Sequence, residues 1–184
     1  RKLEKKFEPD IIFTVGSYSK KLFEKKTNIP THILGSVRRL TKMKYNLKKS
    51  KYINFLILPE GIISECKKLF NFSIICAKEN PLINFTWRLH PSMKFESVLK
   101  KINLKKNLIP NNIIMSKRSF SKDISISNYC IYRGSTSVIT AIQNDIYPLY
   151  YNSNEQINID PTFDLKTWKA EINNIKDFND FMFS

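Results

Sequence analysis

The chain is short of glycine, histidine and cysteine. Its 184 residues include four glycines, two histidines and three cysteines. So few glycines leave no G-x-x-x-x-G-K-[ST] loop and no G-x-G-x-x-G fingerprint, which excludes the two familiar glycine-rich phosphate loops. The sequence has no Asp-x-Asp pair to hold a metal on a nucleotide sugar. It also has no G-x-S-x-G elbow, which argues against a serine hydrolase of the α/β class.

The cysteines and histidines form no metal-binding pattern. Cys66, Cys76 and Cys130 show no C-x-x-C spacing. An odd number of cysteines without a pattern predicts reduced thiols in a cytoplasmic protein. With only His32 and His90 beside them, we expect no zinc site and no metal cofactor.

Long apolar segments are missing as well. No run approaches the roughly 20 residues of a membrane-spanning helix, and the basic start of the chain leads into no apolar signal segment. We therefore expect a cytoplasmic protein. Because residue 1 is Arg rather than Met, we expect a fragment of a longer chain.

Positive charge is present in excess. Lys and Arg number 31 against 16 Asp and Glu, a formal charge of +15. Such a balance favours anionic partners, namely nucleotides, nucleic acid or acidic lipid surfaces. The abundance of Lys, Asn and Ile is also typical of proteins from AT-rich genomes, so the charge has a purely compositional explanation as its alternative. A functional charge would suit peripheral association with an anionic inner membrane leaflet.

Strand and helix patterns alternate along the chain. This alternation predicts an α/β domain, a Rossmann-like parallel sheet with helices on both faces. We expect one domain over residues 1–184, with a basic loop at 38–51 and a C-terminal packing helix within 165–184. The expected strands cover residues 11–15, 31–34, 53–58, 83–89, 112–115, 129–132 and 147–151; the expected helices cover 18–26, 62–78, 93–102, 121–127, 135–143 and 165–181.

Polar loops follow four of the expected strands. They are Glu60-Gly61, His90-Pro91, Ser116-Lys117 and Gly134-Ser135-Thr136-Ser137. In parallel sheets ligands bind beyond the carboxyl ends of the strands. Four polar loops on one rim therefore predict a binding site.

The loop Gly134-Ser135-Thr136-Ser137 comes between a strand and a helix. We expect Gly134 to permit a tight turn, and the hydroxyls to lie where a helix has unpaired N–H groups. Such a helix start attracts phosphate, although an ordinary N-cap is the alternative. Ser121 is the expected cap of the preceding helix.

In His90-Pro91, the proline ends its strand and fixes the histidine at the rim. An imidazole there can donate to a phosphate oxygen or a leaving group. The alternative is a histidine bonded to a neighbouring loop carbonyl.

Together, His90-Pro91 and Ser135-Thr136 (or Thr136-Ser137) resemble the His-Pro and Ser-Ser/Ser-Thr motifs of GT-B-fold glycosyltransferases. The likeness is to bacterial sialyltransferases and polysialyltransferases, and to CDP-glycerol glycerophosphotransferases. The segments at residues 10–17 and 33–38 look like the chain crossing from an N-terminal domain. The resemblance implies the C-terminal, donor-binding half of a GT-B enzyme of surface polysaccharide synthesis.

The resemblance also implies roles. His90 would contact the donor phosphate and assist the leaving group, and Gly134, Ser135, Thr136 and Ser137 would hold that phosphate without a metal. Pro91, Glu60, Gly61, Ser116 and Lys117 would border the nucleotide and sugar. A nucleotide sugar, CMP-linked rather than CDP- or UDP-linked, would be the donor, and a glycan the acceptor. The general base would come from the N-terminal domain and not from this chain.

Other functions stay open. Scattered basic runs and many aromatics fit a nucleic-acid-binding module, but aromatics inside apolar runs suit a core better than base stacking. We therefore expect no nucleic-acid partner. A CDP-glycerol-type phosphotransferase and a sugar-nucleotide epimerase-like domain are further alternatives.

Overall fold

The computed structural model describes residues 7–35, 52–153 and 158–184 of the chain, which divides into two compact units, Arg1–Thr41 and Lys42–Ser184. This differs from the single domain expected over residues 1–184. In the first unit, strands β1 (Ile12–Thr14) and β2 (Thr31–Ile33) are parallel and are joined by helix α1 (Ser17–Glu24). The basic loop expected at 38–51 lies outside the described residues.

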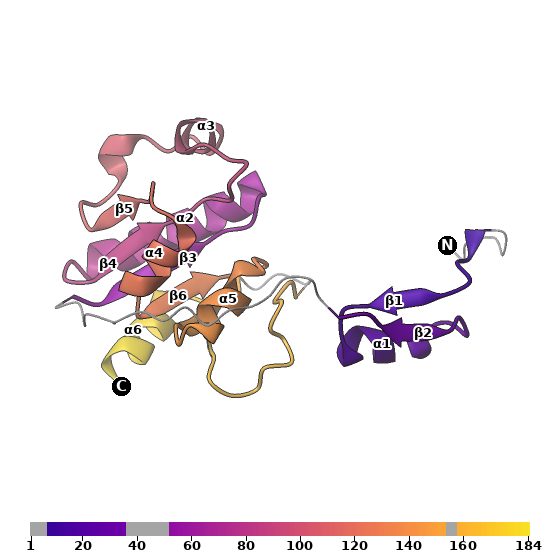
Figure 1. Ribbon diagram of the computed structural model, residues 1–184. Helices are drawn as coiled ribbons and strands as arrows, with labels where there is room; N and C mark the ends of the chain where they lie inside the picture. Colours follow the sequence, from indigo (N-terminus) through magenta and orange to yellow (C-terminus); the bar gives the residue numbers. More distant parts are fainter. Residues whose placement is uncertain (1–6, 36–51, 154–157) are drawn as a thin grey trace. The chain divides into compact units, whose positions relative to one another are not determined.

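The second unit is built on a six-stranded parallel sheet (Figure 1). Its strand order is β5-β4-β3-β6-β7-β8. The expected Rossmann-like α/β class is therefore confirmed. The strands are β3 (Asn54–Leu58), β4 (Asn84–Trp87), β5 (Ile113–Met115), β6 (Tyr129–Tyr132), β7 (Tyr147–Tyr151) and β8 (Ala170–Ile172).

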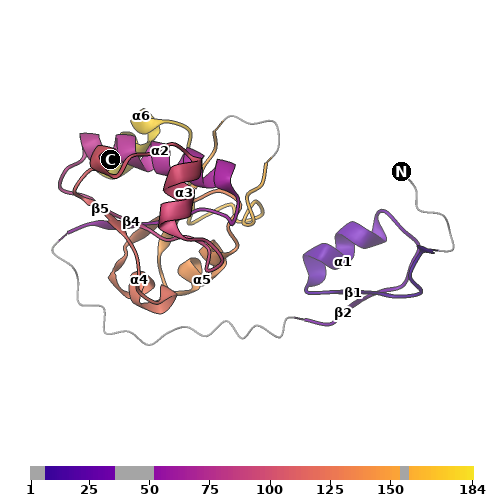
Figure 2. The ribbon, with the colours of Figure 1, turned by 90° about the horizontal axis from the view of Figure 1, so that it is seen from above.

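Helices cover both faces of this sheet. Figure 2 shows α2, α3 and α6 on one side and α4 and α5 on the other. The side changes because the chain winds outwards from β3 to β5, then returns to the opposite side of β3 to form β6. The helices are α2 (Ile63–Glu79), α3 (Phe95–Lys101), α4 (Phe120–Ile126), α5 (Ser137–Gln143) and α6 (Ile175–Phe183), with a short 3-10 turn η2 (Lys106–Leu108).

Aromatic side chains fill the core between the sheet and α2. The rings of Phe70 and Trp87 stack with centroids 3.9 Å apart. The indole N–H of Trp87 donates to Ser73 Oγ at 2.8 Å, which satisfies a polar group inside the core. Phe55 stacks on Phe85 with centroids 5.5 Å apart. These rings are buried and unavailable to stack on nucleic-acid bases.

Two expected helices differ from those observed. Residues 170–172 form strand β8, and the last helix begins only at Ile175. Trp168 has a φ of 56°, which a helix does not allow, and its ring packs against Tyr147 with centroids 5.4 Å apart. Helix α4 is capped by Ser119 rather than Ser121, because the Ser119 hydroxyl accepts the backbone N–H of Lys122 at 3.3 Å. Within the ranges that the structure describes, every helix is too short or too polar to cross a bilayer.

Candidate functional site

The loops after β3 and β6 meet where the winding of the sheet reverses. Glu60 follows β3, Gly134 follows β6, and these strands pair directly. A Cβ atom on Gly134 would overlap Oε1 and Cδ of Glu60. The φ of Gly134 lies outside the left-handed region, so this glycine provides room for Glu60 rather than the special turn conformation expected. Such a reversal point is where open α/β sheets bind ligands.

The carboxyl group of Glu60 is partly desolvated. Its Oε1 is buried and accepts no hydrogen bond from the described residues. Burial, followed by repulsion from Glu65, raises the pKa of Glu60 above its ordinary value of 4.5, while Arg133 and the Gly134 N–H act in the opposite direction. A carboxyl group with an unfilled acceptor atom suits a ligand that presents hydroxyl or amino hydrogens.

His90 follows β4, which pairs with β3 on the side away from β6. Its ring packs on Gly61, because a Cβ atom there would lie 3.5 Å from His90 Cγ. His90 Nδ1 lies 2.7 Å from Ser92 Oγ and accepts the Ser92 backbone N–H at 3.3 Å. These partners place the proton of the neutral ring on Nε2. The exposed imidazole therefore retains an N–H donor for a ligand.

The loop after β6 presents its hydroxyl groups at the start of α5. Thr136 occupies the N-cap position, but its side chain makes no capping hydrogen bond. Ser135 and Ser137 place their Oγ atoms 2.8 Å apart, with Ser135 buried and Thr136 exposed. In the described hydrogen bonds, the serine hydroxyls bond to each other instead of to the N–H groups of the helix.

Hydrogen bonds of the buried Arg133 side chain hold the start of this loop in place. Its side chain is only 1% exposed, and its Nε donates to Glu65 Oε2 of α2 at 2.6 Å. Its Nη1 donates to the Tyr151 carbonyl at 3.1 Å and to Ser153 Oγ at 2.5 Å. One buried guanidinium therefore fixes the end of β6 against α2 and the end of β7. A buried charge of this kind is stable only with its partners in place.

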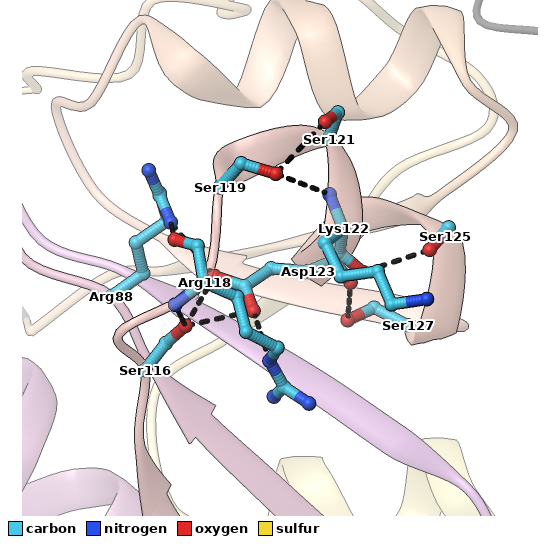
Figure 3. A network of polar contacts seen from close by, with 9 residues as sticks. All are labelled: Arg88, Ser116, Arg118, Ser119, Ser121, Lys122, Asp123, Ser125 and Ser127. Carbon is cyan, nitrogen blue, oxygen red and sulfur yellow. Dashed lines mark hydrogen bonds and ion pairs between the residues drawn. The ribbon is translucent and has the colours of Figure 1, made fainter.

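Asp123 of α4 organises the ends of β4 and β5 (Figure 3). This fully buried carboxylate accepts Arg88 Nη1 at 2.8 Å and Arg118 Nε at 2.9 Å. Ser116 Oγ also lies 2.7 Å from Asp123 Oδ2 and donates to this carboxylate. Two guanidinium groups share one carboxylate, so the cluster retains positive charge. Lys117 beside it is exposed.

The structure brings some of the predicted site residues together and leaves others apart. Glu60 contacts Gly134, and His90 contacts Gly61, the residue after Glu60; the loop to Ser137 continues from Gly134. Ser116 is bonded to Asp123, so its hydroxyl is already used in positioning a loop. Pro91 and Lys117 are exposed at the ends of their strands.

Sequence reasoning missed the two buried charge clusters. Arg133 and Asp123 each lie inside an otherwise ordinary segment. Arg133 directly follows the apolar run of β6, and a charged residue in such a position can indicate a buried charge. Its partners come from distant elements, so the sequence does not identify them. Within the described ranges, no three His, Cys, Asp or Glu side chains gather as metal ligands would.

No family model matches the chain, and no curated protein matches it. Among solved structures, the chain is similar to Thermosulfurimonas dismutans KpsC, described as a beta Kdo 2,7 transferase. The two are 15% identical with a TM-score of 0.42, over 68% of this chain and 40% of that chain. The similarity therefore spans less than half the length of that glycosyltransferase.

Proposed function

We propose that the second unit binds a nucleotide-activated sugar and is the donor-binding half of a glycosyltransferase of surface polysaccharide synthesis. The favoured donor is a CMP-sugar. The observation that carries the proposal is a pair of contacts at the reversal point of the sheet, Glu60 with Gly134 and Gly61 with His90. Each motif's loop thus contacts the loop of Glu60 and Gly61, which supports a phosphate site shared by the His-Pro and Ser-Thr motifs.

In this proposal the donor phosphate lies between His90 and the loop of Ser135, Thr136 and Ser137. The Nε2–H of His90 donates to a phosphate oxygen, and the hydroxyls of the loop donate to others. Fixed donors of this kind stabilise the charge that the phosphate gains as it leaves. The positive charge around Arg88 and Arg118 adds to that field.

The reaction is a displacement at the anomeric carbon. The bond from that carbon to the phosphate oxygen breaks, and its electron pair leaves with the nucleotide. A bond forms to an acceptor hydroxyl, whose proton passes to a base. We assign that base to no residue of this chain.

Glu60 is proposed to orient the donor. Its unfilled Oε1 accepts a hydroxyl or amino hydrogen of the sugar or nucleotide. Lys117 is exposed beyond β5 and is proposed to border the nucleobase of the donor. Ser116 fixes the loop of Lys117 through its hydrogen bond to Asp123.

Calorimetric titration of CMP, CDP, UDP and GDP into the full 184-residue chain tests the proposal. We expect selective binding of a cytidine nucleotide. His90→Ala and the Ser135→Ala/Thr136→Ala double variant should abolish binding. His32→Ala, which removes the histidine of the first unit, and Ser125→Ala on α4 are the matched controls and should bind normally.

Selective binding of UDP would support a glycosyltransferase whose donor is a UDP-sugar rather than a CMP-sugar. Binding of none of the four nucleotides to the folded chain would refute the proposal. Equal loss in His90→Ala and His32→Ala would refute the placement of the site. Transfer of glycerol phosphate from CDP-glycerol would instead support the phosphotransferase alternative.

A further inference from the structure

A separate pocket opens on the α2 and α3 side of the sheet. Its volume is about 250 Å³, and its walls come from the start of α2, the loop after β4 and one face of α3. Ile63, Met93 and Val98 make the apolar part of the wall. The pocket is smaller than the roughly 300–1,000 Å³ typical of drug-sized ligands. It therefore fits a group of about one sugar residue and not a whole nucleotide.

The polar part of the wall is cationic. Ser97 and Lys101 line it from α3, where a spacing of four residues places side chains on one face of the helix, and Lys94 lines it from the extended N-cap position before that helix. No acidic residue lines the pocket. Among the ion pairs of the described ranges, neither lysine has a carboxylate partner. Two ammonium groups and a hydroxyl without a neighbouring acid favour an anionic ligand that also has oxygen atoms to share hydrogen bonds.

The pocket borders the candidate donor site. Ser92 lines the pocket, and its Oγ lies 2.7 Å from Nδ1 of His90. Ile63 also lines the pocket, two residues after Gly61, on which the His90 ring packs. A group held in the pocket would therefore lie next to the imidazole that we assign to the donor phosphate.

We propose that this pocket binds an anionic sugar residue, one that carries a carboxylate or a phosphate, with its charge on Lys94 and Lys101 and its ring against Ile63, Met93 and Val98. Under the proposed function, on which this role rests, the residue belongs to the glycan acceptor. Its position beside His90 brings an acceptor hydroxyl close to the donor. The glycan that this enzyme extends is then an acidic one.

NMR titration of the isotopically labelled 184-residue chain tests the proposal with four probes: glucuronic acid, glucose 6-phosphate, glucose and inorganic phosphate. We expect saturable shifts of the Ser92 and Ser97 amide signals with at least one acidic sugar, and none with glucose. Comparing glucuronic acid with glucose 6-phosphate identifies the anionic group. Equal affinity for inorganic phosphate and for both acidic sugars would overturn the proposal, because it would show that the sugar ring is not recognised.

Three variants locate the binding. Lys94→Ala/Lys101→Ala removes two charge-assisted contacts and should weaken the acidic sugar at least about tenfold. Lys105→Ala/Lys106→Ala removes the same charge outside the pocket and should leave the affinity within about twofold. Ser97→Leu keeps the charge, fills the pocket and should also abolish binding. Equal weakening by the two lysine pairs would overturn the pocket assignment, as would unchanged binding in Ser97→Leu.

The test of the pocket and the test of the donor site can fail independently of each other. Cytidine nucleotide binding by calorimetry with no shift from either acidic sugar would overturn the pocket proposal alone. Acidic sugar binding that the pocket variants abolish, with no nucleotide bound, would overturn the donor assignment and leave the pocket.

Discussion

The contact between Glu60 and Gly134 predicts a strong coupling between these two positions. A Cβ atom on residue 134 would overlap Oε1 and Cδ of Glu60 and lie 3.1 Å from Oε2. Gly134→Ala must therefore displace the Glu60 side chain or shift the loop. The overlapped atoms end a flexible, half-buried side chain, so the cost should lie near the lower end of the about 1–3 kcal/mol that overpacking takes from the unfolding free energy.

The same substitution should behave differently when Glu60 is absent. The backbone of residue 134 is outside the left-handed region, so alanine fits it without strain. In a Glu60→Ala background, Gly134→Ala should then stabilise by about 0.4–1 kcal/mol, because it restricts the unfolded chain. The two backgrounds should differ by about 1.4 kcal/mol or more, well beyond the error of additivity.

Urea unfolding followed by tryptophan fluorescence measures this cycle. Trp87 is fully buried in the core of the second unit, so its emission reports on the unit that holds the site. Four proteins complete the cycle: the native chain, the two single variants and the double variant. An equal cost of Gly134→Ala in both backgrounds would refute the proximity of Glu60 and Gly134, and with it the central contact of the candidate site.

Three further predictions concern charge and capping. Arg133→Met removes one of the two cations bonded to the buried Glu65 carboxylate and leaves Lys68 at 2.9 Å, so it should cost about 1–3 kcal/mol, whereas adding Glu65→Met should restore part of the loss; urea unfolding would contradict this if the double variant were the less stable. Ser119→Ala removes the cap of α4 and should cost about 1 kcal/mol, while Ser121→Ala should stay within about 0.5 kcal/mol; thermal unfolding with the reverse order would contradict the observed cap. Because burial raises the pKa of Glu60, its contribution to stability is present below its ordinary value of 4.5 and is lost as pH rises through the folded pKa. The stability of Glu60→Gln relative to the native chain should therefore increase between about pH 4 and pH 7, and an unchanged difference in urea unfolding across that range would contradict the raised pKa.

Local patterns predicted most of the second unit. The strands at 129–132 and 147–151 were placed residue for residue, because each is an apolar run between strong turn signals. The helix expected over residues 165–181 differs from the structure, because Trp168, Ile172, Ile175 and Phe178 have a helical spacing that does not reflect one continuous helix. In the structure, Ile172 belongs to β8 and only Ile175 and Phe178 belong to α6. Residues 170–172 form the short edge strand β8 because they pair with β7, and local spacing does not reveal that pairing.

The sequence alone determined the alternation of strands and helices and the placing of polar loops after strands. Both follow from short-range rules of periodicity and turn chemistry. Tertiary structure decided the strand order, and so which loops meet: β3 lies between β4 and β6, which brings Glu60 to Gly134 and Gly61 to His90. It also decided the roles of Arg133 and Asp123, because burial of a charge depends on partners supplied by distant segments.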